Sequence, residues 1–219
     1  MKTEELLLKV EKTARYYSND PVSEKPDTLW IVIHGYAQLA KDFIDEFEFL
    51  NDSRTLIIAP EGLSKFYSRN RIGASWMTKE DRSNEINDYL KYLDGLFSVL
   101  KIKYDLSDTM INLLGFSQGV HTAVRWFINS NFVFDNLILC SSDFPVDADF
   151  NKLNQKLVRS KMFYLHGDKD EIVSGKTFNA GIELLNSKDI RFEQIKFEGK
   201  HEIHRETLIS VIKNKNHSV

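Results

Sequence analysis

The sequence predicts an α/β protein with a mostly parallel sheet flanked by helices. Short apolar runs that read as strands alternate with helical patterns along most of the chain, which is typical of a parallel sheet covered on both faces. Several of these runs are apolar at almost every position, as expected for strands buried on both sides. Because no repeat, low-complexity segment or Pro/Gly-rich linker interrupts the series, we expect residues 1–219 to form a single domain.

The first half of the chain is expected to supply three strands and two helices. Residues 10–17 contain aromatic and threonine side chains and are expected to form an antiparallel edge strand. The runs 28–33 and 55–59 are apolar almost throughout, which indicates buried parallel strands, and a short helix at 40–49 connects them. Apolar residues spaced at three and four then predict a long helix over 83–102.

The second half continues the alternation. Apolar runs predict four further strands, at residues 110–114, 137–140, 162–165 and 191–197. Amphipathic patterns predict helices after these strands, at residues 120–128, 177–185 and 208–213. Because the connection between the strands at 137–140 and 162–165 is short, it leaves little room for an inserted lid domain, and we expect none.

Composition and charge exclude several classes of protein. A chain that is 42% hydrophobic and 28% charged is typical of a soluble globular protein, and a formal net charge of −3 gives no basic footprint for nucleic acid. The single cysteine, Cys140, lies in an apolar run and is expected to be a buried thiol rather than a nucleophile or zinc ligand. The apolar run near the N-terminus is too short for a signal-peptide core, and no run is long enough to span a membrane. A cytoplasmic protein is therefore expected.

A serine between two glycines follows the strand-like run 110–114 and precedes the helical pattern 120–128. The stretch Gly115-Phe116-Ser117-Gln118-Gly119 fits the nucleophile elbow of α/β-hydrolases, a tight turn that exposes a serine hydroxyl at the carboxyl end of a strand. The pattern alone is weakly specific, and the alternative is an ordinary serine in a surface turn. Its position between a strand and a helix favours the elbow. The sequence thus predicts the α/β-hydrolase fold without a lid domain, with Ser117 as nucleophile.

A serine nucleophile needs a histidine to accept its proton and a carboxylate to orient that histidine. In α/β-hydrolases the chain order is serine, acid, histidine, and candidates occur here in that order. Asp168 and Asp170 follow the strand at 162–165, and either of them is also a common turn former. His201 and His204 follow the last strand; His201 comes first after a glycine turn, whereas His204 is expected in the first turn of the final helix.

Four short stretches carry a family pattern over nearly the whole chain: His34-Gly35-Tyr36, Gly115-Phe116-Ser117-Gln118-Gly119, His166-Gly167-Asp168-Lys169-Asp170 and Gly199-Lys200-His201. Together they resemble the phospholipase/carboxylesterase family of small serine hydrolases, α/β-hydrolases related to acyl-protein thioesterases. The resemblance implies that Asp170 is the triad acid and His201 the base. It also implies that the backbone N–H of Tyr36 is one donor of an oxyanion hole.

The other oxyanion donor follows from the elbow. The backbone N–H of Gln118, directly after the nucleophile, lies at a helix N-terminus whose dipole favours negative charge. Three positions depart from the family pattern: Ala37 replaces a frequent glycine, Ser174 replaces a common proline, and one residue instead of two separates Gly199 from His201. The last departure favours an esterase over a thioesterase proper.

The apolar residues within 61–81 show no sustained helical or strand periodicity, so this segment is expected to form a long loop. A long loop in a compact domain is usually functional or mobile. Its side chains Phe66, Tyr67, Trp76 and Met77 are candidates for lining an acyl pocket, because such sites are mainly apolar and aromatic. The alternative is that these side chains pack down simply to hold the loop.

The sequence therefore predicts a serine hydrolase that cleaves small-molecule carboxylic esters through an acyl-enzyme, with no metal and no organic cofactor. Alternatives on the same fold are a thioesterase for acyl-protein or acyl-CoA and a peptidase. A non-catalytic binding module is disfavoured because serine, acid and histidine occur in the right order, although a fold alone would not decide this. The oligomeric state is left open, with a homodimer among the alternatives.

Overall fold

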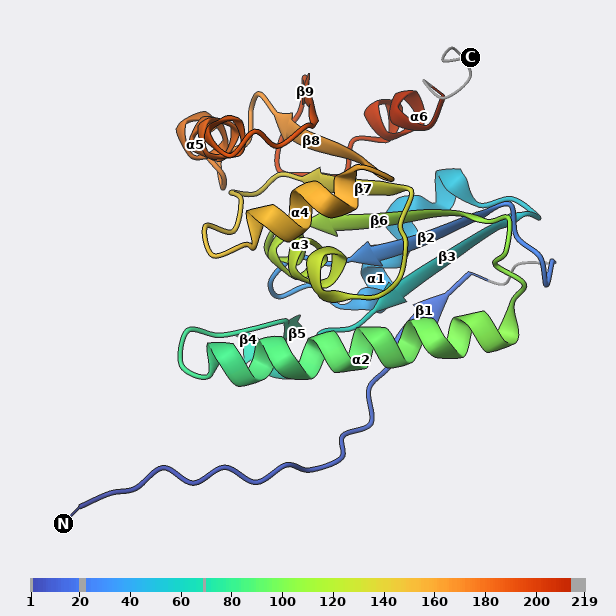
Figure 1. Cartoon of the computed structure of the whole chain (residues 1–219). Coiled ribbons are helices and arrows are strands. Elements are labelled where there is room, and N and C mark those ends of the chain that lie inside the picture. Colours follow the sequence, from blue (N-terminus) through green and yellow to red (C-terminus); the bar gives the residue numbers. More distant parts are fainter. Residues whose placement is uncertain (1, 20–22, 69, 214–219) are drawn as a thin grey trace.

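A seven-stranded sheet forms the centre of the protein in the computed structural model, which describes residues 2–19, 23–68 and 70–213 (Figure 1). Its strand order is β1-β3-β2-β6-β7-β8-β9. β1 pairs antiparallel with β3, and the other neighbours pair in parallel. This confirms the predicted, mostly parallel sheet. The strands are β1 (Tyr16–Ser18), β2 (Thr28–Ile33), β3 (Thr55–Pro60), β6 (Met110–Phe116), β7 (Asn136–Cys140), β8 (Lys161–Gly167) and β9 (Glu193–Phe197).

Helices cover both faces of this sheet. They are α1 (Ala40–Phe43) with the 3₁₀ helix η1 (Ile44–Leu50), α2 (Arg82–Lys103), α3 (Gln118–Asn129), α4 (Phe150–Leu157), α5 (Gly175–Ser187) and α6 (Arg205–Lys213). Alternate residues of β2 enter two separate cores: Leu29, Ile31 and Ile33 pack with α2 to α5, whereas Trp30 and Val32 pack with α1, η1 and α6. This two-residue alternation is how a strand buried on both faces serves two layers of helices.

The structure contains two elements that the sequence analysis did not predict. The expected loop at 61–81 contains an antiparallel hairpin of β4 (Ser64–Ser68) and β5 (Arg71–Ser75). Helix α4, for which the sequence analysis made no prediction, lies in the connection between β7 and β8. The side chain of Asp149 caps α4 by accepting a hydrogen bond from the backbone of Lys152.

The first strand also differs, because it is shorter than expected. Only residues 16–18 pair with β3, whereas residues 10–15 of the expected edge strand are not in the sheet. Along the connection between β7 and β8, residues 141–160 contain α4 and loop segments, in keeping with the expected absence of an inserted lid domain. No helix in the described part of the chain is long and apolar enough to cross a membrane.

Candidate active site

The turn between β6 and α3 presents Ser117 at the carboxyl edge of the sheet. Ser117 has φ 52° and ψ −124°, a left-handed conformation that is strained for a residue with a side chain and typical of functional sites. Its backbone N–H donates to the carbonyl of Cys140 at 2.9 Å, which ties the turn to the end of β7. The serine is therefore fixed by the backbone on either side of it.

Both glycines of the elbow are needed for close backbone packing. A Cβ atom added at Gly115 would lie 2.6 Å from the carbonyl oxygen of Gly119, and one added at Gly119 would lie 2.2 Å from the carbonyl oxygen of Ile33. Neither distance is tolerated by real side chains. The glycines thus allow α3 to start directly against β2 and β6, which is the physical reason for the Gly-x-Ser-x-Gly spacing.

Asp170 and His201 come together from the loops after β8 and β9. His201 Nδ1 lies 2.8 Å from Asp170 Oδ2, and the other carboxylate oxygen accepts hydrogen bonds from the backbone N–H groups of Ile172 (2.9 Å) and Val173 (2.8 Å). Burial raises the pKa of Asp170, but the hydrogen bonds from Val173, His201 and Ile172 outweigh this and lower it overall. The ionised carboxylate therefore holds the proton of His201 on Nδ1 and leaves Nε2 as an acceptor.

The imidazole of His201 lies beside the elbow. Its ring centroid is 4.8 Å from that of Phe116, the residue before the serine. The loops that carry Asp170 and His201 also pack on each other, because a Cβ at Gly167 would lie 2.4 Å from the carbonyl oxygen of Lys200. Asp170 and His201 are thus held together beside the elbow.

Asp168 and His204, the alternatives to Asp170 and His201, make hydrogen bonds that hold loops and the start of α6. Asp168 is exposed; its backbone N–H donates to the carbonyl of Phe197 at 2.9 Å, and its side chain accepts from the backbone N–H of Gly199 at 3.1 Å. His204 Nδ1 lies 2.8 Å from Thr207 Oγ1, and its ring stacks on Phe197 at the start of α6. Asp168 therefore links the turns after β8 and β9, whereas His204 lies directly before α6 rather than within its first turn.

The turn after β2 lies against the serine. A Cβ at Gly35 would lie 3.0 Å from Ser117 Cβ, so the backbone leading to Tyr36 passes next to Ser117. Gln118 is the first residue of α3, where its backbone N–H belongs to the free amino end of the helix. Ala37 has φ 63°, the left-handed region that favours the glycine common at this position in the family pattern.

The four candidate pocket residues lie in different settings. Phe66, on β4, stacks on the exposed ring of Tyr36 at 5.1 Å, and its neighbour Tyr67 is exposed. Trp76 is only 1% exposed and donates from Nε1 to the carbonyl of His34 at 2.9 Å, so it belongs to the core beneath the site. Met77 is half-buried and follows Trp76. Their assignment to an acyl pocket stays a prediction.

The sequence interpretation missed a contribution of the Gln118 side chain. Its Oε1 accepts from the backbone N–H of Trp76 at 3.1 Å, and its Nε2 donates to the carbonyl of Met77 at 3.0 Å. These bonds connect the elbow to the chain after β5. A polar side chain between two elbow glycines was the available signal, but its partners, some 40 positions away, could be identified only from the fold.

His34 and His121 also have partners. His34 is fully buried; its Nδ1 donates to the Gly35 carbonyl at 2.7 Å, and its Nε2 accepts from the backbone N–H of Gly62 at 3.0 Å. Burial lowers the pKa of His34, so this neutral imidazole is a structural link. His121 Nε2 lies 2.8 Å from Asp143 Oδ1. Within the described residues, no three His, Cys, Asp or Glu side chains form a cluster suited to a metal ion.

Comparison with known proteins identifies the family of this chain. A family model described as Phospholipase/Carboxylesterase matches residues 20–217. The chain resembles the solved structure of esterase PE8, with 22% identity, a TM-score of 0.69, and coverage of 95% of this chain and 100% of that one. It also resembles Zea mays acyl-protein thioesterase 2, with 16% identity, a TM-score of 0.69, and coverage of 93% and 98%.

A third solved structure, the Bacillus cereus carboxylesterase, shares 14% identity at a TM-score of 0.64, with 93% of each chain covered. At such identities the likeness concerns the fold. The family model carries the assignment further, because it spans nearly the whole chain and includes the elbow, Asp170 and His201. The chain belongs to the phospholipase/carboxylesterase family of α/β-hydrolases.

Proposed function

We propose that this protein is a serine esterase that hydrolyses small carboxylic esters through an acyl-enzyme, with Ser117, His201 and Asp170 as catalytic triad. The observation that carries the proposal is the 2.8 Å contact between His201 Nδ1 and the buried Asp170 carboxylate, beside a serine held at positive φ. That combination supplies a nucleophile, a base with a free Nε2 and a charge that stabilises the imidazolium.

In the proposed reaction, Ser117 Oγ attacks the ester carbonyl while His201 Nε2 takes the hydroxyl proton. The carbonyl oxygen becomes an oxyanion, which the backbone N–H groups of Gln118 and Tyr36 stabilise. His201 then gives its proton to the leaving alcohol as the acyl-enzyme forms. A water molecule, deprotonated by His201, attacks the acyl-enzyme, and the proton returns to Ser117 as the carboxylic acid leaves.

The substrate is proposed to be an ester with a short or medium acyl group, because only a short helical connection, without an inserted domain, follows β7. Phe66, Tyr67 and Met77 are the proposed pocket side chains nearest the surface, and Trp76 supports them from below. We place the enzyme in the cytoplasm, as a single domain that needs no metal or organic cofactor for this reaction.

The proposal is tested by covalent labelling with a fluorophosphonate and by hydrolysis of p-nitrophenyl esters of increasing chain length, with an acyl-CoA alongside. Ser117→Ala should abolish labelling and lower turnover by on the order of 10⁶. Ser98→Ala is the matched control, because Ser98 is exposed on α2, and it should label fully.

Labelling of Ser117→Ala, or turnover within about tenfold of the parent, would contradict the mechanism. Faster hydrolysis of the acyl-CoA than of every oxygen ester would keep the triad but reassign the protein as a thioesterase.

A further inference from the structure

His166 belongs to the family pattern that ends at Asp170, but its side chain has no part in the reaction proposed above. It lies near the end of β8, two positions after Tyr164, so both rings point to the face of the sheet that α5 covers. The His166 ring stacks on Phe178 of α5, with ring centroids 4.4 Å apart and planes inclined by 13°. Its side chain is only 4% exposed. A polar ring is therefore enclosed directly beside the loop that carries Asp170.

The Nδ1 atom of His166 is buried and has no hydrogen-bond partner among the described residues. It lies 3.9 Å from Asp170 Oδ2, the same oxygen that lies 2.8 Å from His201 Nδ1. A separation of 3.9 Å is too long for a hydrogen bond but allows attraction between a charge and a dipole. Because both side chains are buried, water screens this attraction little.

The charge of the Asp170 carboxylate decides which nitrogen of His166 carries the proton. An unprotonated Nδ1 would turn its lone pair toward a negative oxygen, whereas an Nδ1–H turns the positive end of its dipole there. The charged or titratable groups that act on the ring are Asp170, Lys196, His201 and Asp168. Burial lowers the pKa of His166 and outweighs the attraction of Asp170, so the ring is neutral at neutral pH.

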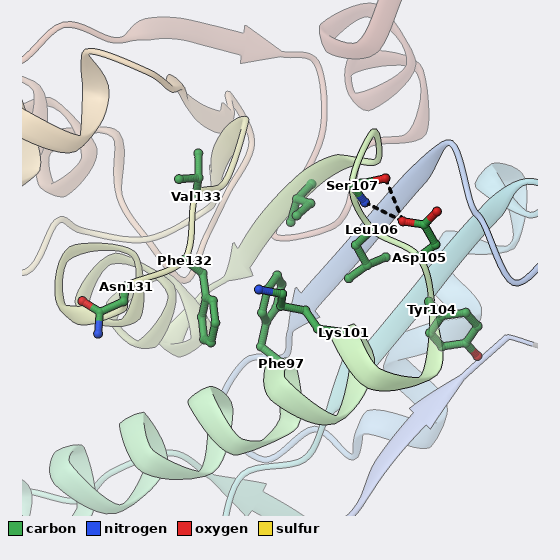
Figure 2. A pocket seen from close by; sticks show the side chains of 10 residues that line it. Phe97, Lys101, Tyr104, Asp105, Leu106, Ser107, Asn131, Phe132 and Val133 are labelled. Atoms are coloured by element: carbon green, nitrogen blue, oxygen red, sulfur yellow. Dashed lines mark hydrogen bonds between the residues drawn. The ribbon is translucent and has the colours of Figure 1, made fainter.

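The apolar groove between α2 and the loop after α3 lies at the other edge of the sheet (Figure 2). Leu106 precedes β6 and Ile111 lies at its start, whereas Ser117 follows the end of β6. Six residues of strand at about 3.3 Å each separate Ile111 from Ser117 by about 20 Å. A group that acts on the triad must therefore lie where β8 and β9 end, as His166 does.

We propose that His166 is a positioning residue of the triad, whose Nδ1–H faces Asp170 Oδ2 and shares that oxygen with His201. The inference rests on the proposed function. A second donor withdraws negative charge from the oxygen, so Asp170 holds the imidazolium form of His201 less strongly. The base then returns to its neutral form at a lower pH and can accept the proton of Ser117 there. His166 thus extends the activity of the enzyme toward acid.

The test compares two variants of the same shape, His166→Leu and His166→Asn, in the full chain. Both lose the ring that stacks on Phe178, but asparagine carries an N–H donor on the atom that corresponds to Nδ1. The pH dependence of kcat/KM is measured with a p-nitrophenyl ester. The acid limb should move to higher pH by about 0.5 unit in His166→Leu, which lowers kcat/KM about threefold at acid pH. His166→Asn should restore the wild-type midpoint.

His204→Leu is the matched control. The His204 ring also stacks on a phenylalanine, Phe197, but its Nδ1 faces Thr207. This variant should lower the melting temperature without moving the acid limb. Melting curves of all variants separate a loss of stability from a change in the pH profile.

Nuclear magnetic resonance tests the same contact without turnover. Nitrogen shifts of the wild type should show a neutral His166 protonated on Nδ1. The proton between His201 Nδ1 and Asp170 should move downfield in His166→Leu, because the remaining hydrogen bond strengthens, and should return in His166→Asn.

An unchanged acid limb in His166→Leu, equal shifts in the leucine and asparagine variants, or an unprotonated Nδ1 in the wild type would each overturn the inference. Ester hydrolysis that survives Ser117→Ala would instead overturn the proposed function. In that case the resonance measurements still decide whether His166 and His201 share the Asp170 oxygen, so the two failures are distinguishable.

Discussion

Replacing Asp170 by asparagine exchanges an acceptor for a donor at the atom that faces His201. In the aspartate, Oδ1 accepts hydrogen bonds from the backbone N–H groups of Ile172 and Val173, at 2.9 and 2.8 Å. We expect the amide oxygen of the variant to take the place of Oδ1, because only this orientation keeps both bonds. Its nitrogen then faces His201 Nδ1, where two donors cannot share a hydrogen bond. The imidazole must move its proton to Nε2, and the acceptor needed by Ser117 is lost.

The expected loss in turnover is about 10⁴, equivalent to about 5.5 kcal/mol in the activation barrier. The fold should persist, since both bonds from the backbone remain and the amide nitrogen can donate to His201 Nδ1 in the new tautomer; replacing a bond to a charged group by a neutral one costs about 1–2 kcal/mol. The assay is steady-state hydrolysis of a p-nitrophenyl ester, beside thermal melting of the same preparation. Turnover within about tenfold of the parent would refute the tautomer argument.

Asp168→Asn is the matched control, because it makes the same chemical change two residues away. The Asp168 side chain accepts one hydrogen bond from the Gly199 backbone at 3.1 Å, which an amide oxygen can replace. We expect nearly full turnover and a change in unfolding free energy of at most about 1 kcal/mol. An inactive but stable Asp168→Asn, found beside an active Asp170→Asn, would show that the acid is the other aspartate.

Three further predictions concern other residues. His201→Ala should abolish ester hydrolysis, whereas His204→Ala should keep most of it and mainly lower the melting temperature; the reverse result would identify His204 as the base. Ala37→Gly should raise the free energy of unfolding in urea by about 0.5–1 kcal/mol, because glycine adopts φ 63° without strain; a destabilised variant would contradict this. Burial raises the pKa of Asp147, but hydrogen bonds from two arginines lower it to about 2. Its carboxylate should therefore stabilise the fold above about pH 4. The loss of unfolding free energy caused by Asp147→Asn should become smaller as the pH falls toward 2. A loss of unfolding free energy that does not change with pH would contradict a stabilising role for the ionised carboxylate.

The sequence was informative where one local pattern decides the structure. Apolar runs such as 28–33 and 110–114 predicted buried strands, because a strand covered on both faces has no polar side to show. The elbow was recognisable because its glycines are required by contacts within a few residues and with the adjoining strand β2. These features depend little on the rest of the chain.

Elements held by distant contacts were not predictable in the same way. The β4–β5 hairpin has no regular alternation of buried and exposed residues, because β5 is exposed at its start and buried from Gly73 onward. It packs where Gly73 approaches the Ala37 backbone; a Cβ at Gly73 would lie 2.8 Å from Ala37 Cα. Helix α4 buries little besides Leu153 and Leu157, too few apolar positions for a clear period. The choice between Asp168 and Asp170 likewise rested on the family resemblance, since composition alone cannot distinguish two neighbouring aspartates.

The place of β9 at the edge of the sheet has a consequence for the local stability of the site. Ser117 follows a central strand, but His201 follows a strand that, among the described residues, has β8 as its single neighbour and is mostly exposed. Amide hydrogen exchange is expected to reveal a partial opening in which β9 detaches while β6 stays protected. Such an opening would carry the base away from an intact nucleophile. The fraction of molecules competent for turnover would then fall on warming well before the main unfolding transition.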